Sequence, residues 1–230
     1  MTRLLVSVRS VAEASLAATG GADFIDLKEP RDGALGGLPV ATIADIVAAL
    51  RHAGSRLPIS ATIGDLPMHV LSDILDQVQA VGECGVDYVK VGIERGPGAA
   101  AVLQALAEMP FAVVPVFIAD HGLDFDLVQR ALHFPAVMVD TADKVSGSLF
   151  DVVSPAELQR FVEQVRGSGA LAGLAGALRL QHLPALAKLA PDFAGFRSAV
   201  CAGDRASVLD AGLLRHLAAR LTSRTAPSPG

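Results

Sequence analysis

The chain has 230 residues, a formal net charge of −5 and a sequence pI near 5.6; 51% of its residues are hydrophobic and 19% are charged. This length and composition favour one compact domain with a sizeable core. The acidic balance excludes a broad basic surface for nucleic acid or for an anionic membrane, because both need clustered Lys and Arg.

Short runs rich in β-branched or apolar residues alternate along the chain with longer segments of helical periodicity. Eight runs are predicted as strands: 4–8, 23–28, 58–63, 88–93, 112–119, 136–142, 169–176 and 193–199. Helices are predicted between and after them, over segments that include 40–50, 68–81, 99–109, 157–165 and 208–221. Ser10 with Glu13, and Ser154 with Glu157, have the spacing of a capping box, which predicts a helix start after each serine.

Eight strand–helix units in a chain of this length predict a single-domain (β/α)8 barrel, the TIM-barrel fold, over residues 1–220. Residues 221–230 form a polar, proline-containing tail that we expect to be disordered. A doubly wound open sheet is the alternative, but the segment 4–11 lacks the Gly-x-Gly-x-x-Gly motif that would follow its first strand.

The cysteines and the apolar runs indicate where such a protein would work. Cys84 and Cys201 form no CxxC pair, so the sequence predicts neither a disulfide framework nor a zinc site, and a reducing cytoplasm fits. The N-terminal apolar run is too short for a signal peptide, and no later run reaches membrane-spanning length. We therefore expect a soluble, cytoplasmic protein with no membrane partner and no nucleic-acid partner.

Alternation along the predicted strands places several charged side chains inside the barrel. In the run 23–28, Asp26 and Lys28 share the face opposite to the apolar side chains, and the same test turns Lys90 and Asp140 inward. Lys144 follows in the loop after the sixth strand. All five lie near the carboxyl ends of strands, where active sites of such barrels are found.

The use of lysine strengthens this prediction. The chain has only four lysines beside fifteen arginines, and Lys28, Lys90 and Lys144 are three of the four. An arginine stays protonated, whereas a lysine amine can attack a carbonyl to form a Schiff base. We expect one inward lysine to be the nucleophile and the other a general acid/base; the alternative is an ordinary ion pair such as Asp26 with Lys28.

The loops after strands seven and eight are the predicted phosphate site, because barrels often bind phosphate there. Gly176 and Ala177 lie in the first loop, and Arg197, Ser198 and Ala199 in the second. A glycine allows backbone N–H groups to approach an anion closely, and a serine adds a hydroxyl. The alternative is that Gly176 only permits a tight turn.

Other polar residues give weaker signals. His121 follows the fifth strand and Asp65 the third, while Glu29 points away from the barrel interior. No pair of histidines has a convincing metal-ligand spacing, and no nucleotide-binding loop is present. We expect no metal and no cofactor.

Six segments together resemble a known family. They are Asp26–Pro30, Gly33–Gly36, Ser60–Asp65, Tyr88–Gly92, Asp140–Lys144 and Gly147–Phe150. The chain resembles (5-formylfuran-3-yl)methyl phosphate synthase over nearly its whole length. The resemblance implies a (β/α)8 lyase that condenses two glyceraldehyde 3-phosphate molecules into 4-(hydroxymethyl)-2-furancarboxaldehyde phosphate, an early step towards methanofuran.

The resemblance also implies residue roles. Lys28 matches the family's Schiff-base lysine and Lys90 its proton-transfer lysine. Asp26, Asp140 and Lys144 match surrounding acid/base and substrate-binding positions. Two loops depart from the family: residues 175–177 are Ala-Gly-Ala where Ala-Gly-Ser is common, and residues 197–199 are Arg-Ser-Ala where Arg-Gly-Ala is common.

Two other functions remain open at the level of sequence. One is a class I aldolase acting on another phosphorylated sugar, which would share the lysine chemistry but not the furan product. The other is a non-catalytic barrel that binds a phosphorylated ligand. In each case the partner is a small phosphorylated molecule, and a homo-oligomer is expected because such barrels often associate.

Overall fold

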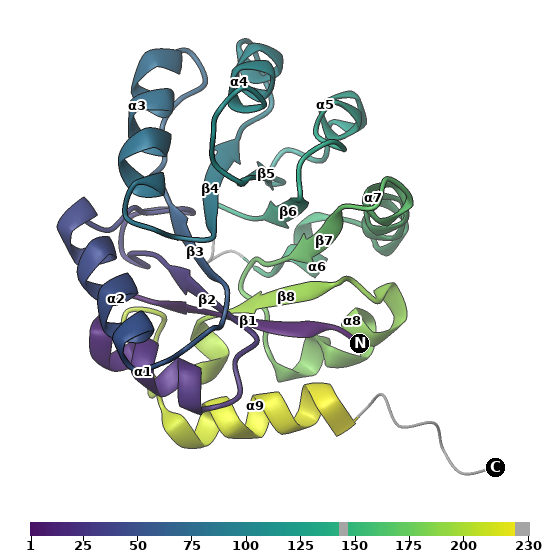
Figure 1. The fold of residues 1–230 in the computed structure, drawn as a ribbon. Coiled ribbons are helices and arrows are strands. Elements are labelled where there is room, and N and C mark those ends of the chain that lie inside the picture. Colours follow the sequence, from purple (N-terminus) through teal and green to yellow (C-terminus); the bar gives the residue numbers. More distant parts are fainter. Residues whose placement is uncertain (143–146, 224–230) are drawn as a thin grey trace.

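A computed structural model of the chain describes residues 1–142 and 147–223. Parallel strands pair in sequence order and the last pairs with the first, so the sheet closes into a barrel (Figure 1). The strands are β1 (Arg3–Val8), β2 (Phe24–Leu27), β3 (Ile59–Thr62), β4 (Tyr88–Ile93), β5 (Val113–Ile118), β6 (Ala136–Asp140), β7 (Leu171–Leu174) and β8 (Phe193–Phe196). The eight predicted strands are confirmed, and closure excludes the doubly wound alternative.

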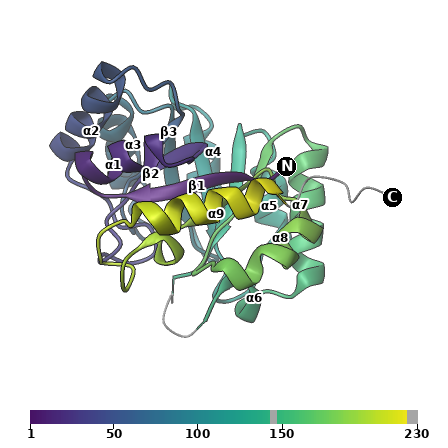
Figure 2. The ribbon, with the colours of Figure 1, turned by 90° about the horizontal axis from the view of Figure 1, so that it is seen from below.

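Helices surround the barrel (Figure 1). They are α1 (Val11–Thr19), α2 (Val40–His52), α3 (Leu71–Gly82), α4 (Ala99–Leu106), α5 (Phe125–Arg130), α6 (Leu149–Val152), α7 (Pro155–Gly167), α8 (Leu183–Leu189) and α9 (Ala211–Ser223), with 3-10 turns η1 (Leu180–His182) and η2 (Ser198–Val200). Figures 1 and 2 both show α9 lying alongside β1. The predicted tail begins inside α9, so residues 221–223 are helical, and 224–230 lie outside the described residues.

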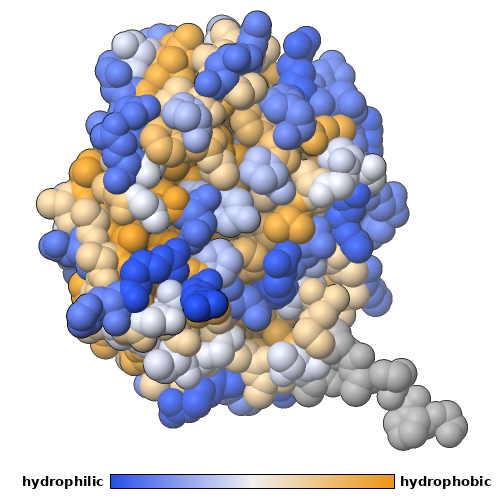
Figure 3. Space-filling view, in the orientation of Figure 1, coloured by the Kyte–Doolittle hydropathy of each residue, from blue (hydrophilic) through white to orange (hydrophobic). Residues whose placement is uncertain are grey.

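Figure 3 shows hydrophilic side chains over the helices at the edge of the molecule, as expected for helices whose other face packs on the sheet. No helix in the described part of the chain is both long enough and apolar enough to cross a membrane.

The two predicted capping boxes differ in the structure. Ser154 and Glu157 form the complete reciprocal pair at the start of α7. At α1, the Ser10 hydroxyl accepts a hydrogen bond from the Glu13 backbone N–H, but the Glu13 carboxylate accepts from the backbone N–H of Arg9. The Glu13 side chain is therefore directed towards other partners, described below.

The core has two layers, as alternation along the strands requires. Outward side chains such as Ile25, Leu27, Val89 and Val91 are at most 1% exposed and pack under the helices. Inside the barrel a second apolar cluster, which includes Phe24 and other large side chains, fills the space enclosed by the strands. The polar inward residues occupy the remaining part of the interior, towards the carboxyl ends of the strands.

A substitution at Gly173 tests the close packing inside the barrel. Gly173 on β7 faces the ring of Phe193 on β8, and a Cβ atom at residue 173 would overlap that ring. We expect Gly173→Ala to lower the free energy of unfolding by about 1–3 kcal/mol, measured by urea denaturation. Gly167→Ala is the matched control, because a Cβ there meets no atom within 4 Å and Ala favours helix, so stability should be unchanged or slightly raised. Equal effects of the two variants would contradict the interior packing.

Candidate active site

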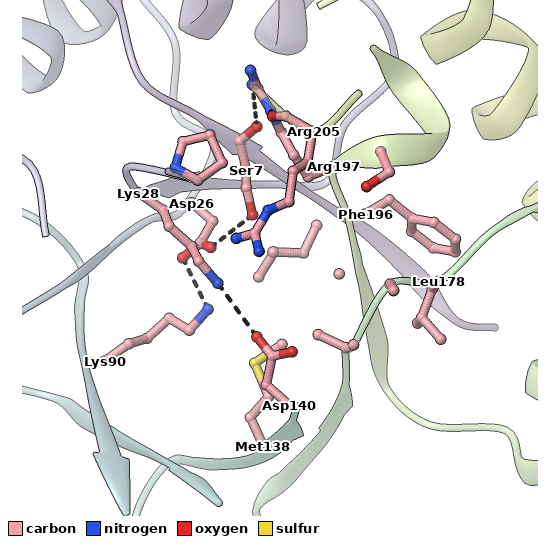
Figure 4. Close-up of a pocket in the computed structure, with 17 residues that line it drawn as sticks. Ser7, Asp26, Lys28, Lys90, Met138, Asp140, Leu178, Phe196, Arg197 and Arg205 are labelled. Atoms are coloured by element: carbon pink, nitrogen blue, oxygen red, sulfur yellow. Dashed lines mark hydrogen bonds and ion pairs between the residues drawn. The ribbon is translucent and has the colours of Figure 1, made fainter. Parts of the chain in front are cut away.

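A pocket opens at the carboxyl ends of the strands (Figure 4), and its empty space is about 510 Å³ when the solvent at its open mouth is included. Its lining includes the four charged side chains predicted on strands β2, β4 and β6 and four of the five residues predicted in the loops after β7 and β8: Asp26, Lys28, Lys90, Asp140, Gly176, Ala177, Arg197 and Ser198. Residues far apart in the sequence therefore meet at one site. Lys144 lies outside the described residues.

Asp26 lies at the centre of a buried hydrogen-bond network. One carboxylate oxygen accepts from the Ser60 hydroxyl at 2.7 Å and from the Lys90 Nζ at 3.0 Å. The other oxygen accepts from the Ser7 hydroxyl at 3.0 Å. Asp26 is 1% exposed, so three neighbouring strands fix its carboxylate at a single position.

The ionisation of Asp26 follows from these contacts. Burial acts to raise the pKa of Asp26, but the positive charges of Lys90 and Lys28 and the hydrogen bond from Ser60 outweigh it. The pKa of Asp26 is therefore held below its ordinary value, and the group is a carboxylate at neutral pH.

Lys28 extends from the end of β2 into the pocket and is 6% exposed. Its Nζ donates to the Asp140 carboxylate at 3.4 Å, and the other Asp140 oxygen accepts from the backbone N–H of Thr141 at 2.8 Å. Figure 4 shows the Lys28 amine between Asp26 and Asp140. The alternative considered from the sequence, an ion pair of Asp26 with Lys28, is not formed; the pairs are Asp26 with Lys90 and Lys28 with Asp140.

Lys90 occupies a deeper position than Lys28. It is 2% exposed and also borders a second cavity inside the barrel, lined mainly by apolar side chains such as Phe24 and Phe193. The two amines thus differ in surroundings, since Lys28 faces the open pocket and Lys90 is enclosed by Asp26 and the interior packing.

The loop after β7 approaches the pocket with unusual backbone geometry. Gly176 has φ +115° and Ala177 has φ +46°, a left-handed conformation that costs an alanine about 1–2 kcal/mol. A Cβ atom at residue 176 would crowd Thr141 and Leu149, so only glycine fits there. Both residues line the pocket with Ser198, whereas Ala199 in η2 is not among the lining residues.

Arg197 does not fit the predicted role of phosphate ligand, because all five of its N–H groups are already used. The guanidinium forms two hydrogen bonds to the Glu13 carboxylate, at 2.6 and 3.1 Å. It also donates to the backbone carbonyls of Ser7, Arg205 and Ser207. Arg197 therefore joins α1, β1 and the loop 201–210 and builds a wall of the pocket.

Three polar residues of the site were missed by the sequence analysis: Ser7 and Arg205, which line the pocket, and Ser60, which binds Asp26 beside it. Ser60 and Ser7 each hold Asp26, and strand alternation would have found them as polar side chains on the inward face. Arg205 lies in the long loop between β8 and α9, where periodicity gives no signal about direction.

The weaker candidates lie outside the pocket lining. Asp65 accepts the backbone N–H of Leu35 at 3.0 and 3.2 Å with its two oxygens, a structural contact. Glu29 accepts from the backbone of Arg31 at 3.0 Å and lies 3.8 Å from the guanidinium of Arg9. His121 is a loop residue whose backbone carbonyl accepts a hydrogen bond from Arg95.

In residues 1–142 and 147–223, no group of three His, Cys, Asp or Glu side chains could hold a metal ion.

Comparisons with known proteins agree with this arrangement. The chain matches the family model described as 4-HFC-P synthase over residues 4–218. It is 39% identical over 211 residues to a protein of Methylorubrum extorquens, provisionally named (5-formylfuran-3-yl)methyl phosphate synthase, covering 90% of this chain and 86% of that protein. It is 35% identical to the Archaeoglobus fulgidus protein of that name, covering 90% of this chain and 94% of the other.

Among solved structures, phosphoribosyl anthranilate isomerase from Thermus thermophilus superposes with a TM-score of 0.69 over 97% of this chain and 100% of the other. Its sequence identity of 18% supports the barrel fold alone. The family match and the curated relatives extend over most of the chain. The chain therefore belongs to the 4-HFC-P synthase family.

Proposed function

We propose that this protein condenses two molecules of glyceraldehyde 3-phosphate into 4-(hydroxymethyl)-2-furancarboxaldehyde phosphate through a Schiff base on Lys28, as a lyase of methanofuran-type cofactor biosynthesis. The reaction balances when two trioses of composition C3H7O6P lose one phosphoric acid and two waters to give C6H7O6P. The names of the relatives support the product, and the buried amine of Lys28 supports the chemistry.

The position of Lys28 is the observation that carries this proposal. Of the two lysines that line the pocket, Lys28 is the more exposed, at 6% against 2% for Lys90, and the Asp140 carboxylate at 3.4 Å can take a proton from its amine. Attack on the aldehyde carbon, followed by loss of water, gives an iminium that draws electrons from the adjacent carbon. That carbon then loses a proton and attacks the aldehyde of the second triose, whose oxygen becomes a hydroxyl.

Lys90 is suited to the proton transfers. Its Nζ lies 3.0 Å from Asp26, and that carboxylate is held by two serine hydroxyls, so the pair keeps a fixed position beside the reacting carbon. A positioned acid/base of this kind accelerates a proton transfer by about 10²–10⁴-fold. Elimination of phosphate and two waters with ring closure then forms the furan, and hydrolysis of the imine, which takes up the water lost when it formed, frees Lys28 and the product. By its match to the family, Lys144 is included in the proposed site.

One phosphate group is assigned to the loops after β7 and β8. Gly176 and Ala177 present their backbone to the pocket, and Ser198 adds a hydroxyl. Backbone N–H groups in such loops bind phosphate without any side-chain charge. Ala199 contributes through its backbone at most, and Arg197 supports this wall through Glu13.

Borohydride trapping tests the nucleophile. Reduction in the presence of glyceraldehyde 3-phosphate should attach the triose to Lys28, as located by peptide mass spectrometry. Lys28→Arg should abolish the adduct and lower the rate of furan formation by about 10³-fold or more, because arginine cannot form an imine. Lys188→Arg, the same change at an exposed lysine on α8, is the control and should keep full activity.

Each outcome of this experiment separates the candidate functions. Absence of an adduct, or full activity of Lys28→Arg, would contradict the covalent mechanism. An adduct without furan absorbance would favour the class I aldolase.

The pKa of Asp26 gives a second, pH-dependent test. Asp26→Asn leaves the buried Lys90 without its carboxylate partner, which should lower the free energy of unfolding at pH 7 by about 3–5 kcal/mol. Because the folded-state pKa of Asp26 lies below the ordinary value of 3.8, the wild-type advantage is present above that pH and is lost as the pH falls through the folded-state pKa. Urea denaturation at pH 7, 5 and 3.5 measures it.

Asp45→Asn on the exposed face of α2 is the control and should leave stability unchanged at all three pH values. If Asp26→Asn were as stable as the wild-type protein at pH 7, the balance of charge assigned to Asp26 would be wrong.

A further inference from the structure

The proposed reaction places a constraint on the pocket, because each of the two substrates carries a phosphate of about −1.5 to −2 charge at pH 7. The loops after β7 and β8 provide for one phosphate. The second phosphate needs a separate partner, and the basic side chains of the pocket are the candidates.

Within the described residues, four basic side chains line the pocket, and three have a carboxylate partner. The pairs are Lys28 with Asp140 at 3.4 Å, Lys90 with Asp26 at 3.0 Å and Arg197 with Glu13 at 2.6 Å. Arg205 is the fourth, and the structure gives it no ion pair in this part of the chain. Its charge is the one that an incoming anion can neutralise without breaking an existing pair.

The guanidinium of Arg205 also keeps donors for a ligand. Its Nη2 donates to the carbonyl of Gly33 at 3.1 Å, the one hydrogen bond that its side chain makes to the described residues. An arginine has five N–H groups in a planar fork, so four of them remain for contacts with phosphate oxygens.

The main chain of Arg205 is held in place while its side chain reaches into the pocket. Its carbonyl accepts from the Nε of Arg197 at 2.8 Å, which anchors the loop. In Figure 4 the Arg197 guanidinium turns to the carbonyl of Ser7, whereas the Arg205 guanidinium extends towards Lys28. Burial is the main cause of a lowered pKa of Arg205, which is the cost of an unpaired charge that a bound anion would offset.

We infer that Arg205 binds the phosphate of the second triose, the one not held by the loops after β7 and β8; this inference rests on the proposed two-substrate reaction. Arg205 reaches the pocket from the loop 201–210 and touches the loop after β2 through Gly33, on the side of the pocket where Pro30 lies. The second phosphate is thus assigned to a side chain that is separate from the loops after β7 and β8, and both groups line the same pocket as Lys28.

Glycerol 3-phosphate is a suitable probe, because it carries the phosphate but has no aldehyde and cannot form an imine. Isothermal titration should show two molecules bound per wild-type chain and one per chain of Arg205→Gln. Arg95→Gln is the matched control: Arg95 lies in the loop after β4 with its side chain 60% exposed, outside the pocket lining, and this variant should bind two.

Kinetics provide the second measurement. For Arg205→Gln the KM for glyceraldehyde 3-phosphate in furan formation should rise about 10- to 100-fold, the usual effect of losing a charge-assisted contact. Borohydride trapping on Lys28 should persist, since the first triose still binds. Arg205→Lys keeps the charge without the fork and should fall between the wild type and Arg205→Gln.

The outcomes separate this inference from the proposed function. A single glycerol 3-phosphate on the wild-type chain, or two on Arg205→Gln with an unchanged KM, would overturn it. Loss of one bound molecule in Arg205→Gln, with no furan formed by the wild type, would keep Arg205 as a phosphate ligand and overturn the proposed reaction. If Arg205→Gln fails to fold, Arg205→Lys is the deciding variant. Wild-type affinity for glycerol 3-phosphate and a wild-type KM in Arg205→Lys would contradict a bidentate contact between the Arg205 guanidinium and the phosphate.

Discussion

The buried carboxylate of Asp26 is the interaction on which the rest of the site depends. It lies on β2 and accepts hydrogen bonds from β1, β3 and β4, through Ser7, Ser60 and Lys90. Two ammonium groups inside a barrel would be costly without such a counter-charge, because removing an ion from water costs several kcal/mol. The same group therefore joins four consecutive strands and fixes the position of the Lys90 amine.

A second buried pair, Arg197 with Glu13, plays the corresponding part at the seam where β8 meets β1. The guanidinium satisfies its five donors with the carboxylate and with three carbonyls, two of them in the loop 201–210. This explains why the capping spacing of Ser10 and Glu13 yields only half a box. The Glu13 carboxylate accepts a hydrogen bond from the backbone N–H of Arg9, and its other hydrogen bonds come from the Arg197 guanidinium. A helix-start motif thus supplies the anion that orders the loop presenting Arg205.

Eight strand–helix units were sufficient to predict the barrel, and strand alternation was sufficient to predict the inward position of Asp26, Lys28, Lys90 and Asp140. Alternation indicates which face a side chain lies on, but it does not say which partner it meets across the barrel. That partner depends on how the strands are staggered, and here each lysine pairs with an aspartate of another strand, Lys90 with Asp26 and Lys28 with Asp140.

Loop residues and distant pairs escape the same reasoning for a different reason. Glu13 and Arg197 are 184 positions apart, and no local period relates them. Arg205 lies in the irregular loop between β8 and α9, where direction is set by tertiary contacts. The sequence could place Arg197 near the pocket, but only its full set of hydrogen bonds shows that it has no donor left for a ligand.

The distribution of charge connects these features to substrate recognition. Lysines and aspartates in ion pairs leave the catalytic part of the pocket close to neutral, so an amine is available for carbonyl chemistry without a large excess of positive charge. Phosphate recognition must then come from groups outside those pairs. Backbone N–H groups at Gly176 and Ala177 carry no net charge, and Arg205 carries the one that the pocket leaves uncompensated among its described residues. In the proposed reaction, the groups assigned to phosphate are separate from those assigned to proton transfer, so the pocket can bind two anions while Lys28 and Lys90 keep their carboxylate partners.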